Sequence, residues 1–239
     1  MDDFEACRVT GVFISRRMTF RPGVITLSTT ADGRLAGHIT PHVHFDVCPT
    51  WLEIAARHLD DARERRTARK AAWNGNDEDA KAETLEREFE SSMQAAMAAA
   101  ISIDSFYANL RDHANISKET IDNWRKKSTA RYKQVTEVLR RVFSLEPRDA
   151  VIIRNTLRQV FQCRDLAVHP SGNFNPPVLH PELQVGVYWL FSYFRADNVE
   201  IIVPEVRNII YQLVTKTKPV SPEVQRYING LRERLPPPP

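Results

Sequence analysis

The stretch Cys163-Arg164-Asp165-Leu166-Ala167-Val168-His169-Pro170 ends a segment in which apolar residues recur at helical spacing. We predict a helix from Arg148 to Val168 on this periodicity. Pro170 disfavours helical geometry at His169, so the imidazole is expected at or just past the last turn. From there it can turn toward Arg164, whereas a straight helix would point the two side chains apart.

Arg164 and His169, with four residues between them, have complementary chemistry. Arginine is a permanent cation whose planar fork fits two phosphate oxygens. Histidine titrates near neutrality, so it can remove a proton from an attacking hydroxyl or deliver one to a leaving oxygen. The pair is therefore suited to metal-independent RNA cleavage, in which the 2′-hydroxyl attacks its own phosphodiester and leaves a cyclic phosphate and a free 5′-hydroxyl.

A very long helix is predicted upstream, from about Asp77 to about His113. Its second half is almost entirely small or apolar, which indicates burial with close approach of neighbouring helices. Asp104 and Asn109 are polar exceptions in this half. Burying such groups without partners costs about 1–3 kcal/mol each. We therefore expect them to be paired or to face a cleft.

The Arg-x4-His spacing at a helix end resembles the signature of the HEPN superfamily of small helical RNA-cleaving or nucleotide-binding domains. The alanine-rich run up to Leu110 resembles the first core helix of that family, and the resemblance covers roughly residues 93–217. It implies that Arg164 and His169 are the catalytic pair and that Asp165 orients them. It also implies a homodimer with two motifs in one cleft. By family analogy, an active enzyme would be a toxin or antiphage effector with an antitoxin or regulatory partner.

A second, non-catalytic interpretation of the motif stays open beside the nuclease. His169 can simply cap the helix C-terminus, where the dipole favours a cation by about 0.3–1 kcal/mol, while Arg164 pairs with Asp104 inside a bundle. The protein would then be a non-catalytic module that binds RNA or nucleotides or that dimerises. A nuclease needs its motif exposed in a positive cleft, whereas a scaffold leaves it buried or paired. The residues that we predict to contact RNA or phosphate are Arg158, Arg154, Asp104 and Asn109.

Residues 1–48 are predicted to be β-rich and to form a small meander. Strands are expected at 9–14, 24–29 and 35–45, with a tight turn at Asp32-Gly33. His38, His42 and His44 lie in this region, and Asp46 falls on the same strand face as the last two. Strand histidines on a partly exposed face and a metal site are both compatible with this pattern.

Residues 49–76 are predicted to be a basic helical arm, with Thr50 as its N-cap. The run from Arg63 to Lys70 is strongly basic. Such a run is either a solvated helix face or a contact for an RNA backbone.

Residues 77–218 complete the predicted helical bundle, and 219–239 form a C-terminal helix and a proline tail. Ser117 is expected to start a short helical turn, and Ser128 to cap a helix that ends near Phe143. The aromatic stretch 188–194 fits a strand or a buried helix. The stretch 198–203 favours a strand, so we predict a short hairpin in this region. A last core helix is predicted to begin at Pro204.

The bulk composition fits a globular protein, and the predicted elements make its fold mainly α. The chain has 239 residues, 42% of them hydrophobic, and a formal net charge of +3, which permits RNA as a partner without requiring it. The three cysteines show no paired spacing and are expected to be reduced. No signal peptide or apolar run of membrane-spanning length is visible, so we expect a cytoplasmic protein without a membrane contact. We expect no cofactor, because no phosphate-loop, dinucleotide or zinc-ligand motif occurs.

Overall fold

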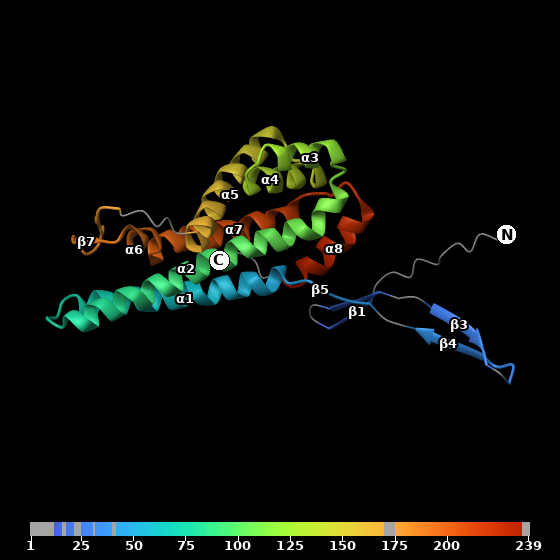
Figure 1. Cartoon of the computed structure of the whole chain (residues 1–239), viewed down its shortest axis with the longest axis horizontal. Helices are drawn as coiled ribbons and strands as arrows, with labels where there is room; N and C mark the ends of the chain where they lie inside the picture. Colours follow the sequence, from blue (N-terminus) through green and yellow to red (C-terminus); the bar gives the residue numbers. More distant parts are fainter. Residues whose placement is uncertain are drawn as a thin grey trace. The chain divides into compact units, whose positions relative to one another are not determined.

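The computed structural model describes residues 12–15, 18–21, 25–30, 32–39, 42–169 and 175–235. The chain divides into two compact units, Met1–Val47 and Cys48–Pro239. It is mainly helical, as predicted, and Figure 1 shows that the helices belong to the second unit.

The N-terminal unit contains antiparallel strands only. Three of them, β1 (Val12–Ser15), β2 (Met18–Arg21) and β5 (His42–Phe45), form one sheet in the order β1-β2-β5. The other two, β3 (Ile25–Thr29) and β4 (Leu35–Ile39), form a hairpin. Gly33 has a φ of 79° in its turn, a conformation that glycine adopts without steric cost.

The sequence predicted three strands in this unit, whereas its described residues contain five. The expected strand 35–45 is two strands, β4 and β5, and β2 was not predicted. Pro41 lies between β4 and β5 and has no N–H for a ladder bond. The side chains of His38, His42 and His44 lie outside the described residues, so the metal hypothesis stays a prediction.

The helical unit is organised around two long helices, α1 (Cys48–Ala72) and α2 (Glu78–Leu110), which run antiparallel as a hairpin (Figure 1). The Asp77 side chain caps α2 by accepting a hydrogen bond of 3.1 Å from the Ala80 N–H. The predicted cap at Thr50 is wrong, because α1 already begins at Cys48.

The remaining helices follow α2 in the chain, and most of them pack against it. They are the single turn η1 (Arg111–His113), α3 (Lys118–Lys126), α4 (Arg131–Val142), α5 (Pro147–Val168), α6 (Trp189–Tyr193), α7 (Ala196–Lys216) and α8 (Pro222–Arg232). Helices α4, α5 and α7 all contact α2. Five alanines of α2 between residues 95 and 100 are at most 2% exposed, so backbones approach closely there.

Ser128 ends α3 instead of capping α4, which corrects the prediction. It has a φ of 47°. Its N–H donates to the Arg125 carbonyl at 3.1 Å, and the Thr129 N–H donates to the Trp124 carbonyl at 2.8 Å. This pattern is the Schellman motif of a helix C-terminus. Ser117, in contrast, caps α3 as predicted.

The stretch 198–203, predicted to lean toward a strand, is helical and belongs to α7. Pro204 therefore lies inside a helix, not at its first position. Val199, Val203 and Val206 are buried at helical spacing, and this burial outweighs both β-propensity and the cost of an internal proline. The hairpin of this region lies earlier, between β6 (Val178–Leu179) and β7 (Gly186–Val187). The aromatic stretch at 188–194 contains the short helix α6.

Candidate active site at the end of α5

Helix α5 ends where the sequence predicted. His169 is its C-cap residue, with φ −127° and ψ 64°, and its N–H donates to the Asp165 carbonyl at 2.8 Å. The residue is exposed. Within the described part of the chain, its imidazole makes no hydrogen bond and no ion pair. The ring is therefore accessible to a ligand.

Arg164 lies one turn earlier and is held between two carboxylates. Its Nη1 donates to Asp104 Oδ2 at 2.7 Å, and its Nε and Nη2 donate to Asp165 Oδ1 at 3.1 and 2.8 Å. Its guanidinium carbon lies 4.7 Å from the centre of the Phe161 ring. The side chain is 24% exposed. The pairing of Arg164 with Asp104, one of the two readings left open by the sequence, is thus present.

Asp104 also holds a second guanidinium, which sequence reasoning missed. Arg131 Nε donates to Asp104 Oδ1 at 2.7 Å, and its guanidinium carbon lies 4.1 Å from the centre of the Tyr107 ring. One signal in the sequence could have indicated it. Arg131 is the first residue of α4, where the helix dipole disfavours a cation, so an arginine there needs a partner elsewhere.

We call Asp104, Arg131, Arg164 and Asp165 the motif cluster. It joins α2, α4 and α5, and its members on α5, Arg164 and Asp165, lie five and four residues before the C-cap residue His169. Asn109 does not belong to it, because its side-chain amide donates to the Tyr227 hydroxyl at 3.2 Å. The other predicted contact residues, Arg154 and Arg158, lie earlier on α5 and are exposed.

The motif cluster balances two guanidinium groups with two carboxylates, but the two carboxylates differ. The Asp165 side chain is 60% exposed, and an exposed ion pair typically contributes about 0–1 kcal/mol. An incoming phosphate can therefore displace Asp165 from the Nε–Nη2 edge of Arg164 at low cost. Arg131 donates only through Nε to the described residues, so its two terminal nitrogens also remain available for an anion.

The basic run of α1 forms a second group of charges, which we call the α1 cluster: Arg66, Arg69, Lys70, Glu88 and Glu182. Arg69 is fully buried and bound to both Glu88 and Glu182. Arg66 Nη2 and Lys70 Nζ lie 2.6 and 2.9 Å from Glu182 Oε1. The solvated face and the RNA contact are therefore both wrong for Arg69, which is fully buried, whereas Arg66 is paired with acids and its side chain is 24% exposed, so an RNA contact there stays a prediction.

The α1 cluster fixes the segment that carries β6 and β7. Burial alone would raise the pKa of Glu182, but hydrogen bonds from Arg66, Lys70 and Arg69 bring that pKa well below its usual range. His180, two residues earlier, is fully buried. Its Nδ1 accepts hydrogen bonds of 3.3 Å from the N–H groups of Glu182 and Leu183. Burial, followed by the charge of Arg69, lowers the pKa of His180.

Cys163 adjoins the motif and belongs to the hydrophobic core. The side chain is buried, and its thiol lies 3.8 Å from the Tyr193 hydroxyl. Burial raises the pKa of the Cys163 thiol, which reduces the share of the nucleophilic thiolate. Within the described ranges, no cluster of histidine, cysteine and carboxylate side chains is arranged to hold a metal ion.

Comparisons of the chain with protein-family models, with curated proteins and with solved structures found no match. Among the described helices, none is long and apolar enough to cross a membrane. The assignment of a site therefore rests on the residues and geometry of this chain.

Proposed function

We propose that the protein is a metal-independent endoribonuclease of the HEPN type and that its helical unit is a HEPN bundle. One observation carries the proposal. Two arginines from different helices, Arg131 and Arg164, bind one carboxylate, Asp104, and Arg164 lies five residues before the exposed C-cap residue His169. Fixed cations and an accessible imidazole are what cleavage of a phosphodiester by its own 2′-hydroxyl requires.

In the proposed reaction, a backbone phosphate takes the place of Asp165 on Arg164, and Arg131 binds a second phosphate oxygen. His169 accepts the proton of the 2′-hydroxyl as the 2′ oxygen bonds to phosphorus. The bond from phosphorus to the 5′ oxygen breaks, and that oxygen takes a proton from His169 of a second copy or from water. Proton transfer by one positioned side chain contributes about 10²–10⁴-fold to such a reaction.

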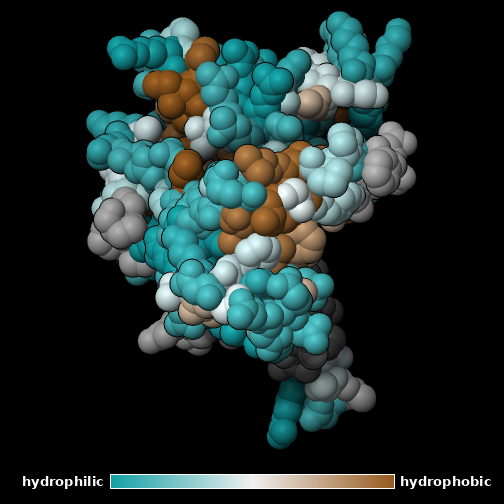
Figure 2. Space-filling view, turned by 90° about the vertical axis from the view of Figure 1, so that its left-hand side faces the viewer, coloured by the Kyte–Doolittle hydropathy of each residue, from teal (hydrophilic) through white to brown (hydrophobic). Residues whose placement is uncertain are grey.

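The proposal includes a homodimer, because a second copy would supply a second motif to the same cleft. Figure 2 shows a hydrophobic patch over α6 and the β6–β7 hairpin. Leu179 and Tyr188 in this region are 61% and 42% exposed, and such a patch is typical of an interaction surface. A molar mass of one chain in solution would contradict the dimer. A role as a toxin or antiphage effector with an antitoxin is proposed by family analogy alone.

One observation favours the second candidate function, a non-catalytic module that binds RNA or nucleotides or that dimerises. Arg164 is paired on both sides, with Asp104 and with Asp165. In that reading the motif stabilises the junction of α2, α4 and α5, and the affinity for RNA does not depend on His169.

The decisive experiment measures RNA cleavage by the purified protein in excess EDTA. We expect cleavage by the wild type, a loss of at least about 100-fold in His169→Ala, and a comparable loss in Arg164→Ala. Arg57→Ala and His58→Ala on α1 are matched controls that remove the same side-chain types away from the motif, and both should cut normally. Unfolding curves should show that all four variants fold.

Two outcomes would reject the nuclease. No cutting of varied RNAs by the wild type would favour the binding module. Equal cutting by the wild type, His169→Ala and Arg164→Ala would place the activity at another site or in a contaminant.

A further inference from the structure

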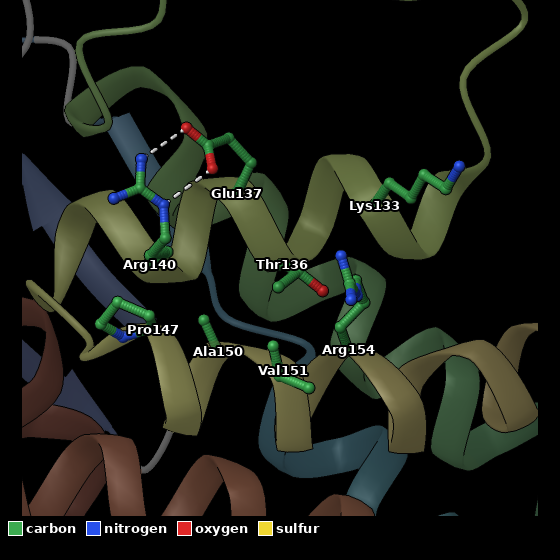
Figure 3. Close-up of a pocket in the computed structure, with 8 residues that line it drawn as sticks. All are labelled: Lys133, Thr136, Glu137, Arg140, Pro147, Ala150, Val151 and Arg154. Atoms are coloured by element: carbon green, nitrogen blue, oxygen red, sulfur yellow. Dashed lines mark hydrogen bonds and ion pairs between the residues drawn. The ribbon is translucent and has the colours of Figure 1, made fainter.

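A groove between α4 and α5 lies outside the motif and has no role in the reaction described above. It has a volume of about 330 Å³. Figure 3 shows how its side chains project from the two facing helices. The lining residues are Lys133, Thr136, Glu137 and Arg140 from α4 and Pro147, Ala150, Val151 and Arg154 from α5.

At one end of this α4–α5 groove, the charged side chains form ion pairs with one another. Arg140 binds Glu137 through Nε and Nη2 at 2.9 and 2.8 Å, and Arg141 Nε binds the same carboxylate at 2.6 Å. The hydrogen bond from Arg140, joined by that from Arg141, lowers the pKa of Glu137 to about 2. This carboxylate is therefore ionised, and it binds both guanidinium groups.

The other end carries cations without matching acids. Lys133 and Arg154 are exposed, and within the described ranges neither side chain forms an ion pair or a hydrogen bond. Between the two ends, Ala150 and Val151 of α5 form an apolar floor opposite Thr136 of α4, and Pro147 extends this apolar surface toward Arg140 (Figure 3). Val151 is 44% exposed there. An apolar surface beside unmatched cations is complementary to a ligand with an apolar ring and an anionic group.

Along the two helices, the cationic end is the end of the groove nearer to the motif residues Arg131 and Arg164. Lys133 lies two residues after Arg131 on α4, and Arg154 lies on the same helix as Arg164. The helical rise places Arg154 about 15 Å before Arg164 along α5. At about 3.4 Å per stacked nucleotide, this separation corresponds to roughly four nucleotides. Arg158, exposed and without an ion pair in the described part of the chain, lies between them.

We propose that the α4–α5 groove is a subsite for single-stranded RNA, and that it holds one nucleotide a few positions from the bond cut at the motif. The base lies against Val151 and Pro147, and the phosphate binds Arg154 and Lys133. The connecting strand passes Arg158 on its way to Arg164. The position relative to the cut rests on the proposed function, whereas the binding of RNA in the groove can be measured without any cleavage.

The test is the affinity of a fluorescein-labelled short oligouridylate, measured by anisotropy in the full chain carrying His169→Ala, which keeps the RNA intact. We expect the added double substitution Lys133→Ala/Arg154→Ala to weaken binding about tenfold. It should also reduce the slope of log affinity against log salt by about 0.7 per lost phosphate contact. Val151→Glu should weaken binding by a similar factor, because it places an acid on an exposed part of the floor. Arg57→Ala is the matched control and should bind like the His169→Ala parent.

The proposal is overturned if the groove variants bind within twofold of the parent, if Arg57→Ala weakens binding as much as they do, or if the parent does not bind RNA. The last result would leave an acidic protein as the occupant to test. Cleavage by the wild type is measured in the separate assay in excess EDTA. RNA bound through the groove but never cut would keep the subsite and reject the nuclease. If RNA is cut at the motif but the groove variants bind RNA like the parent, the nuclease is kept and the subsite is rejected.

Discussion

The motif cluster and the α1 cluster are both built from cations bound to carboxylates, but the central ion pair of the α1 cluster is far less exposed than that of the motif cluster. In the α1 cluster, the side chains of Arg69 and Glu88 are 0% and 2% exposed. In the motif cluster, those of Arg164 and Asp165 are 24% and 60% exposed. Buried charges must be matched almost completely, whereas partly exposed ones can exchange partners with a ligand.

This difference separates a structural role from a functional one. Both oxygens of Glu88 are used, one by Arg69 and the other by the Ala196 N–H at 3.1 Å, at the start of α7. The α1 cluster thereby ties α1 and α2 to α7, and through Glu182 to the segment that follows the motif. The motif cluster retains unused N–H groups on Arg131 and an easily displaced carboxylate, Asp165, on Arg164.

Arg69→Met should have the largest effect of the substitutions compared here. It leaves Glu88 buried without its cationic partner and removes one partner of Glu182, so we expect a loss of about 3–5 kcal/mol in the free energy of unfolding. The matched substitution Arg164→Met should cost only about 1 kcal/mol, because its partners can turn toward water. Urea unfolding with both variants measures the difference.

A second variant separates the lost charge pairing from lost packing. Arg69→Met combined with Glu88→Gln should recover part of the stability, because the glutamine is neutral and still offers an acceptor to the Ala196 N–H. Equal losses in Arg69→Met and Arg164→Met would show that the two clusters do not differ in the way their burial indicates.

A smaller effect is expected in the pH dependence of stability, through His180, which lies beside the α1 cluster. The pKa of His180 is lowered in the folded protein, so the unfolded chain binds the proton more readily. The stability that neutral His180 contributes is therefore present above the unfolded pKa of about 6.5 and is lost as the pH falls below it. His180→Asn can still accept from the N–H groups of Glu182 and Leu183 but does not titrate.

We expect the wild type to lose more unfolding free energy than His180→Asn between about pH 7.5 and pH 5.5, a window that brackets the unfolded pKa. Glu182 does not interfere, because its lowered pKa puts the loss of its contribution at more acidic pH. Parallel curves of unfolding free energy against pH for the two proteins would remove the role assigned to His180.

The sequence predicted the features that depend on local signals. Pro170 in the sequence limits α5, so the position of His169 at a helix end was predictable. The start of α2 at Asp77 also agrees with the prediction. The Asp104 pairing of Arg164 was recognised as an alternative, because a polar residue in a buried helix needs a partner.

The features that it missed depend on contacts between distant segments. Glu182 is more than a hundred residues from the arginines that it binds, and no local pattern distinguishes such a run from a solvated face. Arg131 belongs to the site only because α4 returns to Asp104. Residues 198–203 have β-branched side chains, but burial at helical spacing against the core determines their conformation.

Asp165→Asn should have the smallest effect on stability and a specific effect on function. Removing an exposed charge should change the unfolding free energy by less than about 1 kcal/mol. If Asp165 occupies the phosphate-binding edge of Arg164, its neutralisation removes a competitor, and the affinity for RNA should rise about two- to fivefold, which corresponds to the energy of one exposed ion pair. Asp112→Asn, which neutralises an exposed carboxylate that pairs with the adjacent Arg111, is the matched control. A lower affinity in Asp165→Asn would mean that Asp165 orients Arg164 for the substrate instead of competing with it.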